Sequence, residues 1–475
     1  MAKEQFVSQI ADIEKDFPQW YTDVVLKTRL VDYGPVKGTM VIRPYGYAVW
    51  ELIQKQLDEM FKAEGVQNAY FPLLIPMSFL SKEAEHVEGF APEVAVVTHA
   101  GGEKLAEPLV IRPTSETIIG NMCSKWVQSY RDLPLLINQW CNVMRWEKTT
   151  RPFLRTSEFL WQEGHTVHAT AEEAEAETQK MLGVYKTFAE NCLAIPVITG
   201  RKTEKEKFAG AVATYGMEAM MKDGKSLQAG TSHYMGQNFA KAFDIKFLDR
   251  DGALKHAYTT SWGVSTRLIG AIIMTHGDER GLVFPPKVAP VQAVIVPIAA
   301  KKGGVSEACA ALEEKLKKAG VRVQTDNSEN SPGWKFNEWE MKGVPVRVEV
   351  GPRDLAEGKV MLFRRDTLEK VPAPLDTAAE AVASLLETVQ KDMLEAARAR
   401  RDGRIVYADD MSALLEGVEK GNFVKAGWCG DRACEDKVKE QTAATARVYA
   451  EGESAETCVC CGKKARHMII FARAY

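Results

Sequence analysis

Apolar residues recur with helical spacing in one early segment of the chain. Val49, Ile53 and Leu57 fall on one face and Gly65 follows as a C-cap, so residues 46–64 predict an amphipathic helix. The pattern also predicts strands over 68–76, 135–144 and 153–162, a helix over 114–130, a helix from the capping box of Thr170 and Glu173 to about residue 192, and short strands up to residue 258. Because strands dominate and two of them flank a short charged loop, we expect an antiparallel hairpin in this region.

The pattern changes after Pro286, where predicted strands and helices begin to alternate. The expected elements are strands over 291–297, 321–325 and 344–350, separated by helices over 306–319 and 335–342. Strict alternation is typical of a mostly parallel sheet covered by helices. A long helix over 377–401 then leads into a cysteine-bearing end. The predicted fold class is therefore α+β, with an antiparallel-sheet domain over 1–287, an α/β domain over 288–390 and a small α+β domain over 391–475.

Length and charge set limits on this architecture. The 475 residues suffice for about three domains at roughly 150 residues each. With 45% hydrophobic and 26% charged residues, the composition is globular and argues against disorder, collagen and coiled coil. No apolar run approaches the roughly 20 residues that span a bilayer, and residues 1–17 lack a signal-peptide core, so we expect a soluble cytoplasmic protein without membrane contact. The net charge of −3 means that a nucleic-acid partner would need a local positive patch.

Several short motifs suggest chemistry that their context does not support. Asp223-Gly224-Lys225-Ser226 ends like a phosphate-binding loop, but Ala219 stands where the leading glycine is required. His165 and His168 would point to opposite faces of a strand, which favours packing or substrate contact over a shared metal.

Charged residues interrupt the predicted hairpin where a buried strand would carry apolar ones. Arg145 and Glu147 close its first strand, Arg155 opens the second, Glu163 ends it, and Arg267 precedes a distant apolar run. Singly, these charges are most simply explained as structural salt bridges on an exposed face. Together with an aromatic ring between them, they fit a site in which two arginines hold a polyphosphate, the ring stacks on a base, and carboxylates bind amines or a divalent ion.

The same stretches resemble the three sequence motifs of class II aminoacyl-tRNA synthetases. The matching segments are Phe71-Pro72, Arg145-x-Glu147 with Arg155-Thr156-Ser157-Glu158-Phe159-Leu160-Trp161-Gln162-Glu163-Gly164-His165, and Ser261-Trp262-Gly263-Val264-Ser265-Thr266-Arg267. Further segments, Arg112-Pro113-Thr114-Ser115-Glu116, Gly230-Thr231-Ser232-His233 and Thr275-His276-Gly277-Asp278, resemble prolyl-tRNA synthetases of the archaeal and eukaryote-like type. The resemblance covers essentially the whole chain. It implies an ATP-dependent ligation of L-proline to tRNA(Pro) through a prolyl-adenylate.

The resemblance also implies roles for individual residues. Arg145, Arg267 and Glu147 would be the catalytic set. The ATP site would comprise Arg145, Glu147, Arg155, Thr156, Phe159, Gln228, Thr231, Ser265 and Arg267. The proline site would comprise Thr114, Glu116, Arg145, Trp161, Glu163, His233, Ser261, Trp262 and Gly263. Adenylate formation needs positioning and charge neutralisation, which arginines and Mg²⁺ can supply without a nucleophilic side chain.

The family resemblance carries expectations about editing and assembly. Only 104 positions separate Glu163 from Arg267, which leaves no room for the editing insertion of bacterial-type relatives. We therefore expect no hydrolysis of mischarged alanyl-tRNA(Pro) by this chain. A homodimer is expected, with residues 46–64 and Pro72 near its interface.

The predicted α/β domain resembles the anticodon-binding domain of several class II synthetases. Residues 333–345 combine aromatic rings, a carboxylate and cations, which is how proteins bind unstacked bases of single-stranded loops. Glu340 and Arg347 are the expected base contacts. A solvated helix face remains the simpler account of Lys335 and Lys342.

Five cysteines gather near the end of the sequence. Cys429-x4-Cys434 is followed, after 23 intervening residues, by Cys458-Val459-Cys460-Cys461-Gly462. Two cysteine pairs in a segment with few apolar residues favour a structural Zn²⁺ site over free thiols. Cys429, Cys434, Cys458 and Cys461 are the preferred ligands because the glycine should follow the second ligand, but Cys460 stays an alternative to Cys461. In the family, the terminal tyrosine carboxylate folds toward the catalytic site.

Two other functions remain open from the sequence. One is a synthetase of the same subclass for another amino acid, such as threonine or glycine. The other is a non-catalytic tRNA-binding or metabolite-sensing relative. The second is disfavoured because such proteins tend to lose the phosphate-binding arginines, whereas Arg145 and Arg267 are both present.

Overall fold

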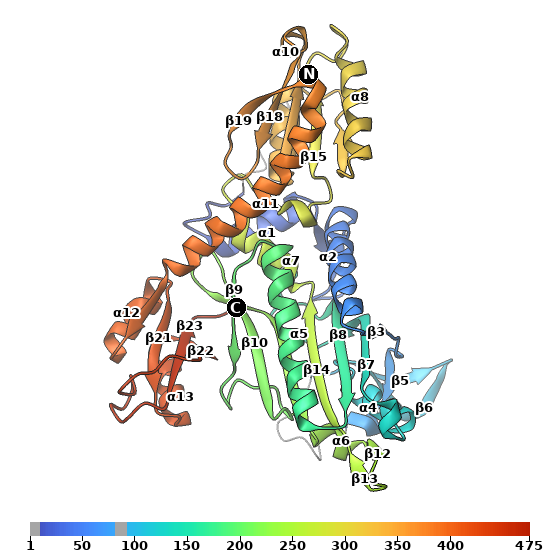
Figure 1. The fold of residues 1–475 in the computed structure, drawn as a ribbon, viewed down its shortest axis with the longest axis vertical. Helices are drawn as coiled ribbons and strands as arrows, with labels where there is room; N and C mark the ends of the chain where they lie inside the picture. Colours follow the sequence, from blue (N-terminus) through green and yellow to red (C-terminus); the bar gives the residue numbers. More distant parts are fainter. Residues whose placement is uncertain (1–9, 81–92) are drawn as a thin grey trace.

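A seven-stranded sheet occupies the middle of the molecule (Figure 1) in the computed structural model, which describes residues 10–80 and 93–475. In spatial order its strands are β3 (Gln67–Asn68), β7 (Leu135–Met144), β8 (Glu158–His168), β14 (Tyr258–Ser265), β11 (Ser226–Gly236), β10 (Ala213–Met220) and β9 (Val197–Arg201). Every neighbouring pair except β3 and β7 is antiparallel, which confirms the predicted sheet type. The N-terminal segment considered for a signal peptide lies partly outside the described residues.

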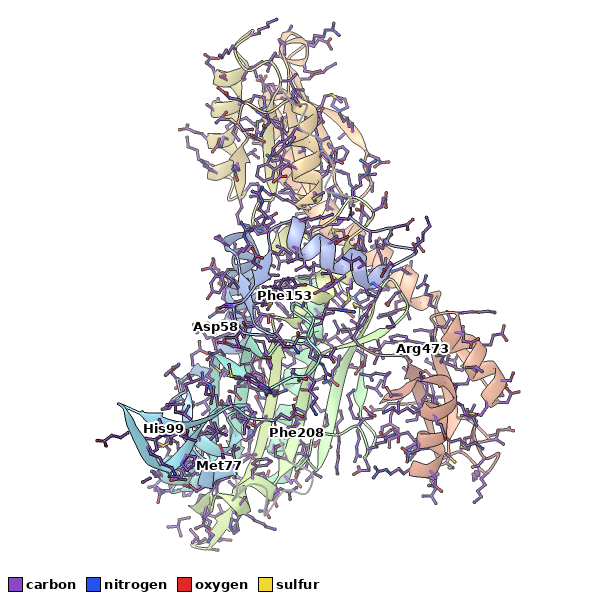
Figure 2. The ribbon with its side chains drawn as sticks, turned by 180° about the vertical axis from the view of Figure 1, so that it is seen from behind. Asp58, Met77, His99, Phe153, Phe208 and Arg473 are labelled. Atoms are coloured by element: carbon purple, nitrogen blue, oxygen red, sulfur yellow. The ribbon has the colours of Figure 1, made fainter. Side chains whose placement is uncertain are left out.

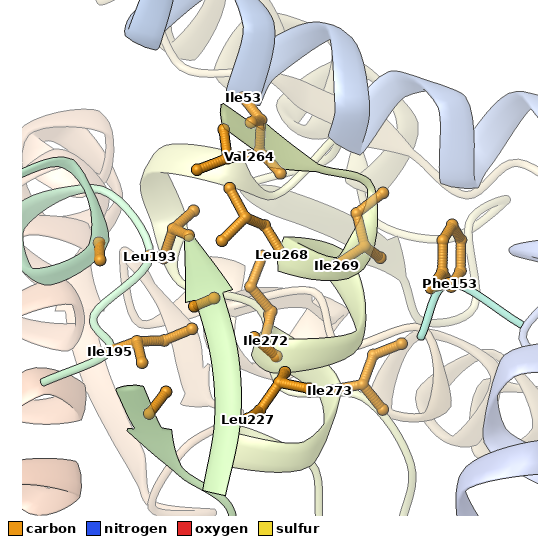
Figure 3. Close-up of a cluster of buried hydrophobic side chains, with 14 of the residues drawn as sticks. Ile53, Phe153, Leu193, Ile195, Leu227, Val264, Leu268, Ile269, Ile272 and Ile273 are labelled. Carbon is orange, nitrogen blue, oxygen red and sulfur yellow. The ribbon is translucent and has the colours of Figure 1, made fainter. Parts of the chain in front are cut away.

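Three helices cover one face of this sheet and bury its core. They are α2 (Pro44–Ala63), α5 (Ala171–Asn191) and α7 (Arg267–His276). The α5 helix begins where predicted, since the Thr170 side chain accepts a hydrogen bond from the backbone N–H of Glu173. Figure 3 shows Leu268 and Ile272 of α7 close to Val264 of β14. This packing leaves the opposite face of the sheet available for polar side chains.

The predicted strand over 153–162 begins and ends too early. Residues 153–157 form a loop, and Phe153 has a φ of 60°, which a strand does not accommodate. The strand β8 instead continues to His168, so Glu163 lies near its middle. Within this longer strand the polar side chains of Thr166 and His168 bond to each other. Buried polar groups that are paired in this way are tolerated in a central strand.

Smaller elements surround the central sheet. They are α1 (Phe17–Lys27), β1 (Val31–Tyr33), β2 (Met40–Ile42), β4 (Leu74–Pro76), β5 (Val96–Ala100), β6 (Glu103–Ile111), α4 (Glu116–Trp126), α6 (Asn238–Ala242), β12 (Lys246–Leu248) and β13 (Leu254–His256). The predicted strand over 68–76 is therefore two short strands, β3 and β4, in different sheets. The helix predicted over 114–130 is shorter than expected. The α-helix α4 ends at Trp126, and a 3₁₀ turn follows at Tyr130–Asp132.

A five-stranded sheet forms the second region, drawn at one end of the molecule in Figure 1. In spatial order its strands are β16 (Val323–Thr325), β15 (Ala293–Pro297), β17 (Val346–Val350), β18 (Lys359–Arg364) and β19 (Lys370–Pro374), and its helices are α8 (Val305–Lys318), α9 (Pro332–Met341) and α10 (Pro352–Ala356). The first three strands are parallel, as predicted, whereas β18 and β19 pair antiparallel. The helix between β17 and β18 spans only five residues, which is too short for a parallel crossover.

The long helix α11 (Ala378–Asp402) connects this region to the third, as predicted. The third region contains β20 (Ile405–Ala408), α12 (Met411–Glu419), β21 (Phe423–Trp428), α13 (Arg432–Thr442), β22 (Thr445–Tyr449) and β23 (His467–Ala472). Its strand β22 lies against β9 of the central sheet, where a Cβ on Gly200 would stand 2.7 Å from the Tyr449 carbonyl oxygen. Across 10–80 and 93–475, no helix is long and apolar enough to cross a membrane.

Candidate active site

A cavity of about 330 Å³ opens on the sheet face that the helices leave uncovered. Side chains alternate along β8, so Trp161, Glu163 and His165 line the cavity while Gln162 points to the α5 side and bonds Tyr185. The predicted site residues in its lining are Thr114, Glu116, Arg145, Phe159, Trp161, Glu163, Gln228, Thr231, His233, Ser261, Trp262, Gly263, Ser265 and Arg267. The structure thus brings together residues that are far apart in the sequence.

Arg145 and Arg267 enter this cavity from different elements. Arg145 follows β7 and donates from Nε to the Pro113 carbonyl at 3.0 Å, and its guanidinium lies 5.4 and 5.5 Å from the ring centroids of Phe159 and Trp161. Arg267 opens α7 and donates to the carbonyls of Leu154 and Gln228 at 3.1 and 3.3 Å. Among the described residues, neither guanidinium has a carboxylate within hydrogen-bonding distance.

The pKa values of both arginines reflect this lack of a close counter-charge. Burial lowers the pKa of Arg145, although Glu116 and Glu163 oppose the shift. Burial, together with Arg155 and Arg145, lowers the pKa of Arg267 to about 10. Both groups remain cationic at neutral pH, and an anion between them would relieve their mutual repulsion. The cavity is therefore suited to bind a phosphate-bearing ligand.

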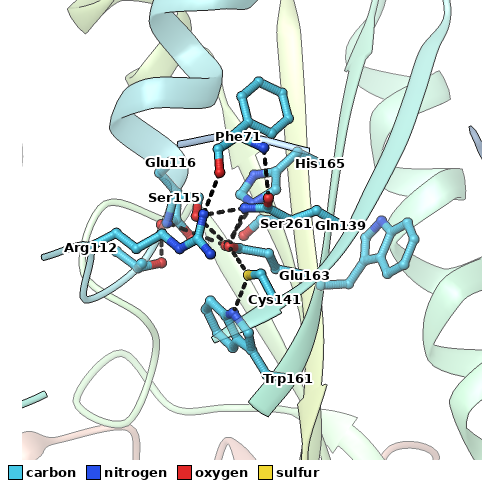
Figure 4. A network of polar contacts seen from close by, with 12 residues as sticks. Phe71, Arg112, Ser115, Glu116, Gln139, Cys141, Trp161, Glu163, His165 and Ser261 are labelled. Carbon is cyan, nitrogen blue, oxygen red and sulfur yellow. Dashed lines mark hydrogen bonds and ion pairs between the residues drawn. The ribbon is translucent and has the colours of Figure 1, made fainter. Parts of the chain in front are cut away.

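A buried polar network fixes the Glu163 carboxylate in the lining of the cavity (Figure 4). Gln139 Nε2 donates to Glu163 Oε1 at 2.9 Å, the Ser115 hydroxyl donates to the same oxygen, and His165 Nε2 lies 3.2 Å from Oε2. The side-chain carbonyl of Gln139 accepts from the backbone N–H of Phe71 at 3.1 Å. Gln139, Ser115 and His165 therefore hold this carboxylate directly, and Phe71 supports it through Gln139.

Two histidines of the cavity have opposite charge preferences. Burial would lower the pKa of His165, but Glu163 outweighs that effect and raises it. Burial would likewise raise the pKa of Glu163, and the hydrogen bond from His165 is the main cause of its net lowering. Burial lowers the pKa of His233 to about 3, so this ring is neutral at pH 7. Its Nδ1 lies 3.0 Å from the Thr214 hydroxyl.

Three predicted ATP-site residues lie outside the cavity lining. Arg155 is exposed and pairs with Glu147 at 3.3 Å on the loop between β7 and β8. Thr156 is buried and donates to the backbone carbonyl of Glu158 at 2.7 Å. Glu147, Arg155 and Thr156 are close in sequence to residues that line the cavity, but they do not line it themselves. Trp262, although in the lining, packs its ring against Phe61 and Tyr185 in the core.

One wall of the cavity was not predicted from the sequence. Glu206, Lys207 and Phe208 line it from the loop between β9 and β10 (Figure 2 labels Phe208), and Thr214 lines it from β10. Phe208 lies 4.9 Å from His233, measured between ring centroids. The loop has neither apolar periodicity nor a recognised motif, so the sequence carries no signal for this wall.

The predicted anticodon contacts lie together in the second region. Arg347 in β17 donates to Glu340 at 2.7 Å and to Glu349 at 2.9 Å. Its guanidinium is buried between the rings of Phe336 and Phe363, at 4.1 and 4.0 Å from their centroids. Arg347 is therefore enclosed by protein, and Glu340 retains a small exposed fraction, 12% of its side chain.

Four cysteines of the third region converge to form a candidate metal centre. The sulfur atoms of Cys429, Cys434, Cys458 and Cys461 all lie within 4.8 Å of one another, and Cys460 does not belong to this group. The Cys429 sulfur lies 3.7 Å from that of Cys434 and 3.8 Å from that of Cys461. Zn–S bonds of about 2.3 Å in a tetrahedron place sulfurs about 3.8 Å apart, so the geometry fits zinc. Burial would raise the pKa of Cys458, but backbone N–H groups lower it to about 7, which favours the thiolate.

The end of the chain returns to the central sheet. Tyr475 donates its backbone N–H to the carbonyl of Ser226 at 3.1 Å, and its hydroxyl donates to Asp223 at 2.6 Å. The Asp223-Gly224-Lys225-Ser226 sequence, considered above as a phosphate loop, is thus a turn into β11 that anchors the C-terminus.

Comparisons with known proteins agree with this geometry. Family models match residues 99–276 (tRNA synthetase class II core domain), 292–385 (anticodon binding domain) and 411–475 (prolyl-tRNA synthetase, C-terminal). The proline–tRNA ligase of Alkaliphilus oremlandii is 61% identical, over 100% of this chain and 99% of the relative. Proline–tRNA ligase 2 of Clostridioides difficile is 59% identical over the full length of both chains.

A solved structure is similar over nearly the whole fold. The crystal structure of prolyl-tRNA synthetase from Cryptosporidium parvum, complexed with halofuginone and AMPPNP, is 42% identical with a TM-score of 0.94, and the match covers 98% of this chain and 99% of that one. The predicted architecture of a class II catalytic domain, an anticodon-binding domain and a C-terminal domain is confirmed. The chain therefore belongs to the class II prolyl-tRNA synthetase family and has proline-tRNA ligase activity.

Proposed function

We propose that the cavity between β8, β11 and β14 binds ATP and L-proline side by side and joins them as prolyl-adenylate before transfer to tRNA(Pro). The observation that carries this proposal is the convergence of Arg145 and Arg267, which face the cavity with hydrogen bonds only to backbone carbonyls among the described residues. The AMPPNP in the Cryptosporidium parvum complex supports ATP as the nucleotide.

The two arginines would divide the triphosphate between them. Arg145, nearer to Glu116 and Glu163, would neutralise the α-phosphate and the proline carboxylate, whereas Arg267 at the start of α7 would bind the γ-phosphate. The proline carboxylate would attack the α-phosphorus in line and pyrophosphate would leave. Because charge builds up on phosphate oxygens, fixed guanidinium groups stabilise the transition state without reorganising.

Phe159, Gln228, Thr231 and Ser265 would complete the adenosine and phosphate contacts within the cavity. Glu147, Arg155 and Thr156 would reach the nucleotide from the loop beside the cavity, with Glu147 as a candidate for binding Mg²⁺, which supplies further charge neutralisation when bound. A salt bridge of 3.3 Å already places Glu147 next to Arg155. The arrival of ATP would draw both side chains inward.

Proline would occupy the end of the cavity between β8 and α4. Glu116 lies in the lining and its carboxylate accepts from the Thr114 hydroxyl, so it can pair with the secondary ammonium of proline. The faces of Trp161 and His233 would hold the ring methylenes, and Glu163, Ser261, Trp262 and Gly263 would set the pocket's size. Glu163 would act from the network shown in Figure 4.

We further propose that this chain is of the archaeal and eukaryote-like type and does not edit alanyl-tRNA(Pro). The support is the 104-position spacing between Glu163 and Arg267, which the rest of β8, the helix α5 and the elements from β9 to β14 occupy. A shape-selective pocket discriminates against smaller amino acids by only about 1–3 kcal/mol, so mischarging with alanine should be measurable. Hydrolysis of alanyl-tRNA(Pro) by this chain alone would contradict the proposal.

The remaining regions would serve tRNA binding and assembly. We take 1–287 as the catalytic domain, 288–390 as the anticodon-binding domain and 391–475 as the zinc-binding domain. Glu340 would contact the anticodon, with Arg347 holding its carboxylate. Cys429, Cys434, Cys458 and Cys461 would bind a structural Zn²⁺. A homodimer with α2 and Pro72 near its interface, and a cytoplasmic location beside the ribosomes that use its product, complete the proposal.

The test is amino-acid-dependent exchange between ATP and pyrophosphate. Proline should support exchange, and threonine and glycine should not. Exchange with threonine or glycine but not with proline would show that the pocket binds another amino acid. No exchange with any of the three would contradict adenylate formation in this cavity.

A further inference from the structure

One wall of the catalytic cavity comes from the loop of residues 202–211, which we call the 202–211 loop. It contributes Glu206, Lys207 and Phe208 to the lining. The Phe208 ring lies 4.9 Å from that of His233, and its backbone N–H donates to the Thr214 hydroxyl at 2.9 Å. The same hydroxyl lies 3.0 Å from His233 Nδ1. The loop therefore bounds the half of the cavity assigned above to proline, not the half assigned to the triphosphate.

The start of this loop depends on one residue, Thr203. Its backbone carbonyl accepts from the N–H groups of Glu206 and Lys207 at 3.1 and 3.0 Å. The preceding Lys202 is tied to β10 by a backbone hydrogen bond to the carbonyl of Thr214 at 2.8 Å. Because the cavity-lining residues follow Thr203 directly, a shift of Thr203 would shift the wall.

The side chain of Thr203 is held by the C-terminal region and not by the catalytic sheet. Its hydroxyl donates to Glu435 Oε1 at 3.0 Å, 232 positions away on α13. Both residues are almost fully buried, at 1% and 3% exposure. Beside them Lys205 pairs with Asp436 at 2.6 Å, at the surface. Glu435 directly follows Cys434 of the four-cysteine group, so its helix begins at that group.

A second buried contact joins the start of the loop to β22 of the C-terminal region. Glu218 of β10 accepts from Lys202 Nζ at 2.6 Å and from Arg447 Nε and Nη2 at 3.0 and 2.9 Å. All three side chains are buried, and Arg447 belongs to β22 of the C-terminal region. Because three buried charges that pair with one another tolerate little displacement, β22 is held in one position against β9 and β10. The helix α13 packs against β22 and is held with it.

We propose that Thr203 and Glu435 are positioning residues for the amino-acid half of the catalytic cavity. Through their hydrogen bond, α13 of the C-terminal region sets the 202–211 loop, and with it Phe208, at the distance from His233 that proline binding requires. The C-terminal region would thus affect proline binding without touching the substrate. This inference rests on the proposed function of the cavity.

The test compares variants that remove or keep the hydrogen bond. Thr203→Val keeps the shape and removes the donor, and we expect the KM for proline to rise about three- to tenfold, since a hydrogen bond to a charged group in a buried place is lost. The KM for ATP should stay within about twofold, because the triphosphate half of the cavity has other walls. Glu435→Ala should behave like Thr203→Val.

Conservative variants and a matched control separate positioning from general damage. Thr203→Ser and Glu435→Gln each keep a donor or an acceptor and should restore the KM for proline to nearly the wild-type value. Glu440→Ala, an exposed position on the same helix, should leave both KM values unchanged. If Thr203→Val folds poorly, the exposed pair gives a milder version: Lys205→Ala should raise the KM for proline by a smaller factor.

Hydrogen exchange provides a readout independent of catalysis. In Thr203→Val, amides of residues 202–211 should exchange faster than in the wild type, and those of β8 and β14 should not change. Wild-type enzyme that catalyses proline-dependent exchange, combined with a Thr203→Val variant of unchanged KM for proline and unchanged loop protection, would overturn the inference. Wild-type enzyme without proline-dependent exchange would instead overturn the proposed function.

Discussion

Two pairs of arginines in this molecule meet their surroundings in different ways. Arg145 and Arg267 of the catalytic region face a cavity and donate only to backbone carbonyls among the described residues. Arg347 and Arg365 of the second region are enclosed and paired, Arg347 with Glu340 and Glu349, and Arg365 with both carboxylate oxygens of Asp278.

A guanidinium that faces a cavity is available to bind a ligand, whereas an enclosed and paired guanidinium stabilises the fold. A paired, enclosed arginine contributes to stability, and its removal leaves a carboxylate without its partner. An arginine beside a cavity, with its pKa lowered by burial and by a second arginine, gains its counter-charge only when an anion binds. The two pairs should therefore respond to mutation in opposite ways, activity for the first and stability for the second.

The largest expected effect is the loss of catalysis in Arg145→Ala or Arg267→Ala. Proline-dependent exchange of pyrophosphate should fall about 100- to 1000-fold, because each guanidinium stabilises charge that develops on phosphate oxygens. The free energy of unfolding should change by only about 1–2 kcal/mol, since hydrogen bonds to carbonyls and, for Arg145, ring contacts are lost but no ion pair is broken. Arg155→Ala, at an exposed position, is the matched control and should lose less than about tenfold. Equal losses in all three variants would remove the contrast between cavity-facing and exposed arginines.

The second expected effect is on stability and not on activity. Arg365→Ala should lower the free energy of unfolding of the protein by about 3 kcal/mol. The reason is that the Asp278 carboxylate loses both hydrogen bonds from the buried Arg365. The kcat of the folded fraction should stay near the wild-type value, since Arg365 lies outside the cavity lining. Chemical denaturation and exchange kinetics measure the two quantities separately. A stable but inactive Arg365→Ala variant would contradict the division between the pairs.

The four-cysteine group allows a similar comparison for a bound cation, between a cysteine inside the group and its neighbour outside it. Cys461→Ser should lower the bound zinc, measured by metal analysis after gel filtration, and should lower the melting temperature of the C-terminal region. Cys460→Ser, the neighbour outside the group, should keep one zinc per chain. Zinc loss in Cys460→Ser with retention in Cys461→Ser would reverse the ligand assignment.

The smallest expected effect is a pH dependence at His165. Glu163 raises the pKa of His165 in the folded state, so its contribution to stability is full below the unfolded pKa of about 6.5 and is lost as pH rises through the folded pKa. The difference in melting temperature between wild type and His165→Gln should therefore be larger at pH 6 than at pH 9. A difference that grows with pH would show that His165 is neutral in the folded protein.

The sequence indicated the two cavity-lining arginines and the cysteine group, whereas it did not indicate the wall formed by residues 206–208. Arg145 and Arg267 were found because charges among apolar residues need a partner or a ligand. Glu206 and Lys207 are also charged but occur in an ordinary polar loop, and their placement depends on Glu435, 229 and 228 positions further along the chain. Contacts over such distances leave no local pattern.

Errors in the strands have a related physical cause. The predicted strand ended at residue 162, whereas β8 continues to His168, because Thr166 and His168 satisfy each other inside the protein. The antiparallel pair β18 and β19 was not predicted, since the expected parallel sheet was inferred from an alternation that stops at β17. Local pattern thus located the elements, and pairing within the fold decided their limits and directions.

The most direct test of the account is a crystal structure of this chain with proline and a non-hydrolysable ATP analogue. We expect guanidinium nitrogens of Arg145 and Arg267 within about 3 Å of phosphate oxygens on the same triphosphate, with the proline ring between Trp161 and His233. A triphosphate bound elsewhere, with both guanidinium groups still facing an empty cavity, would contradict it.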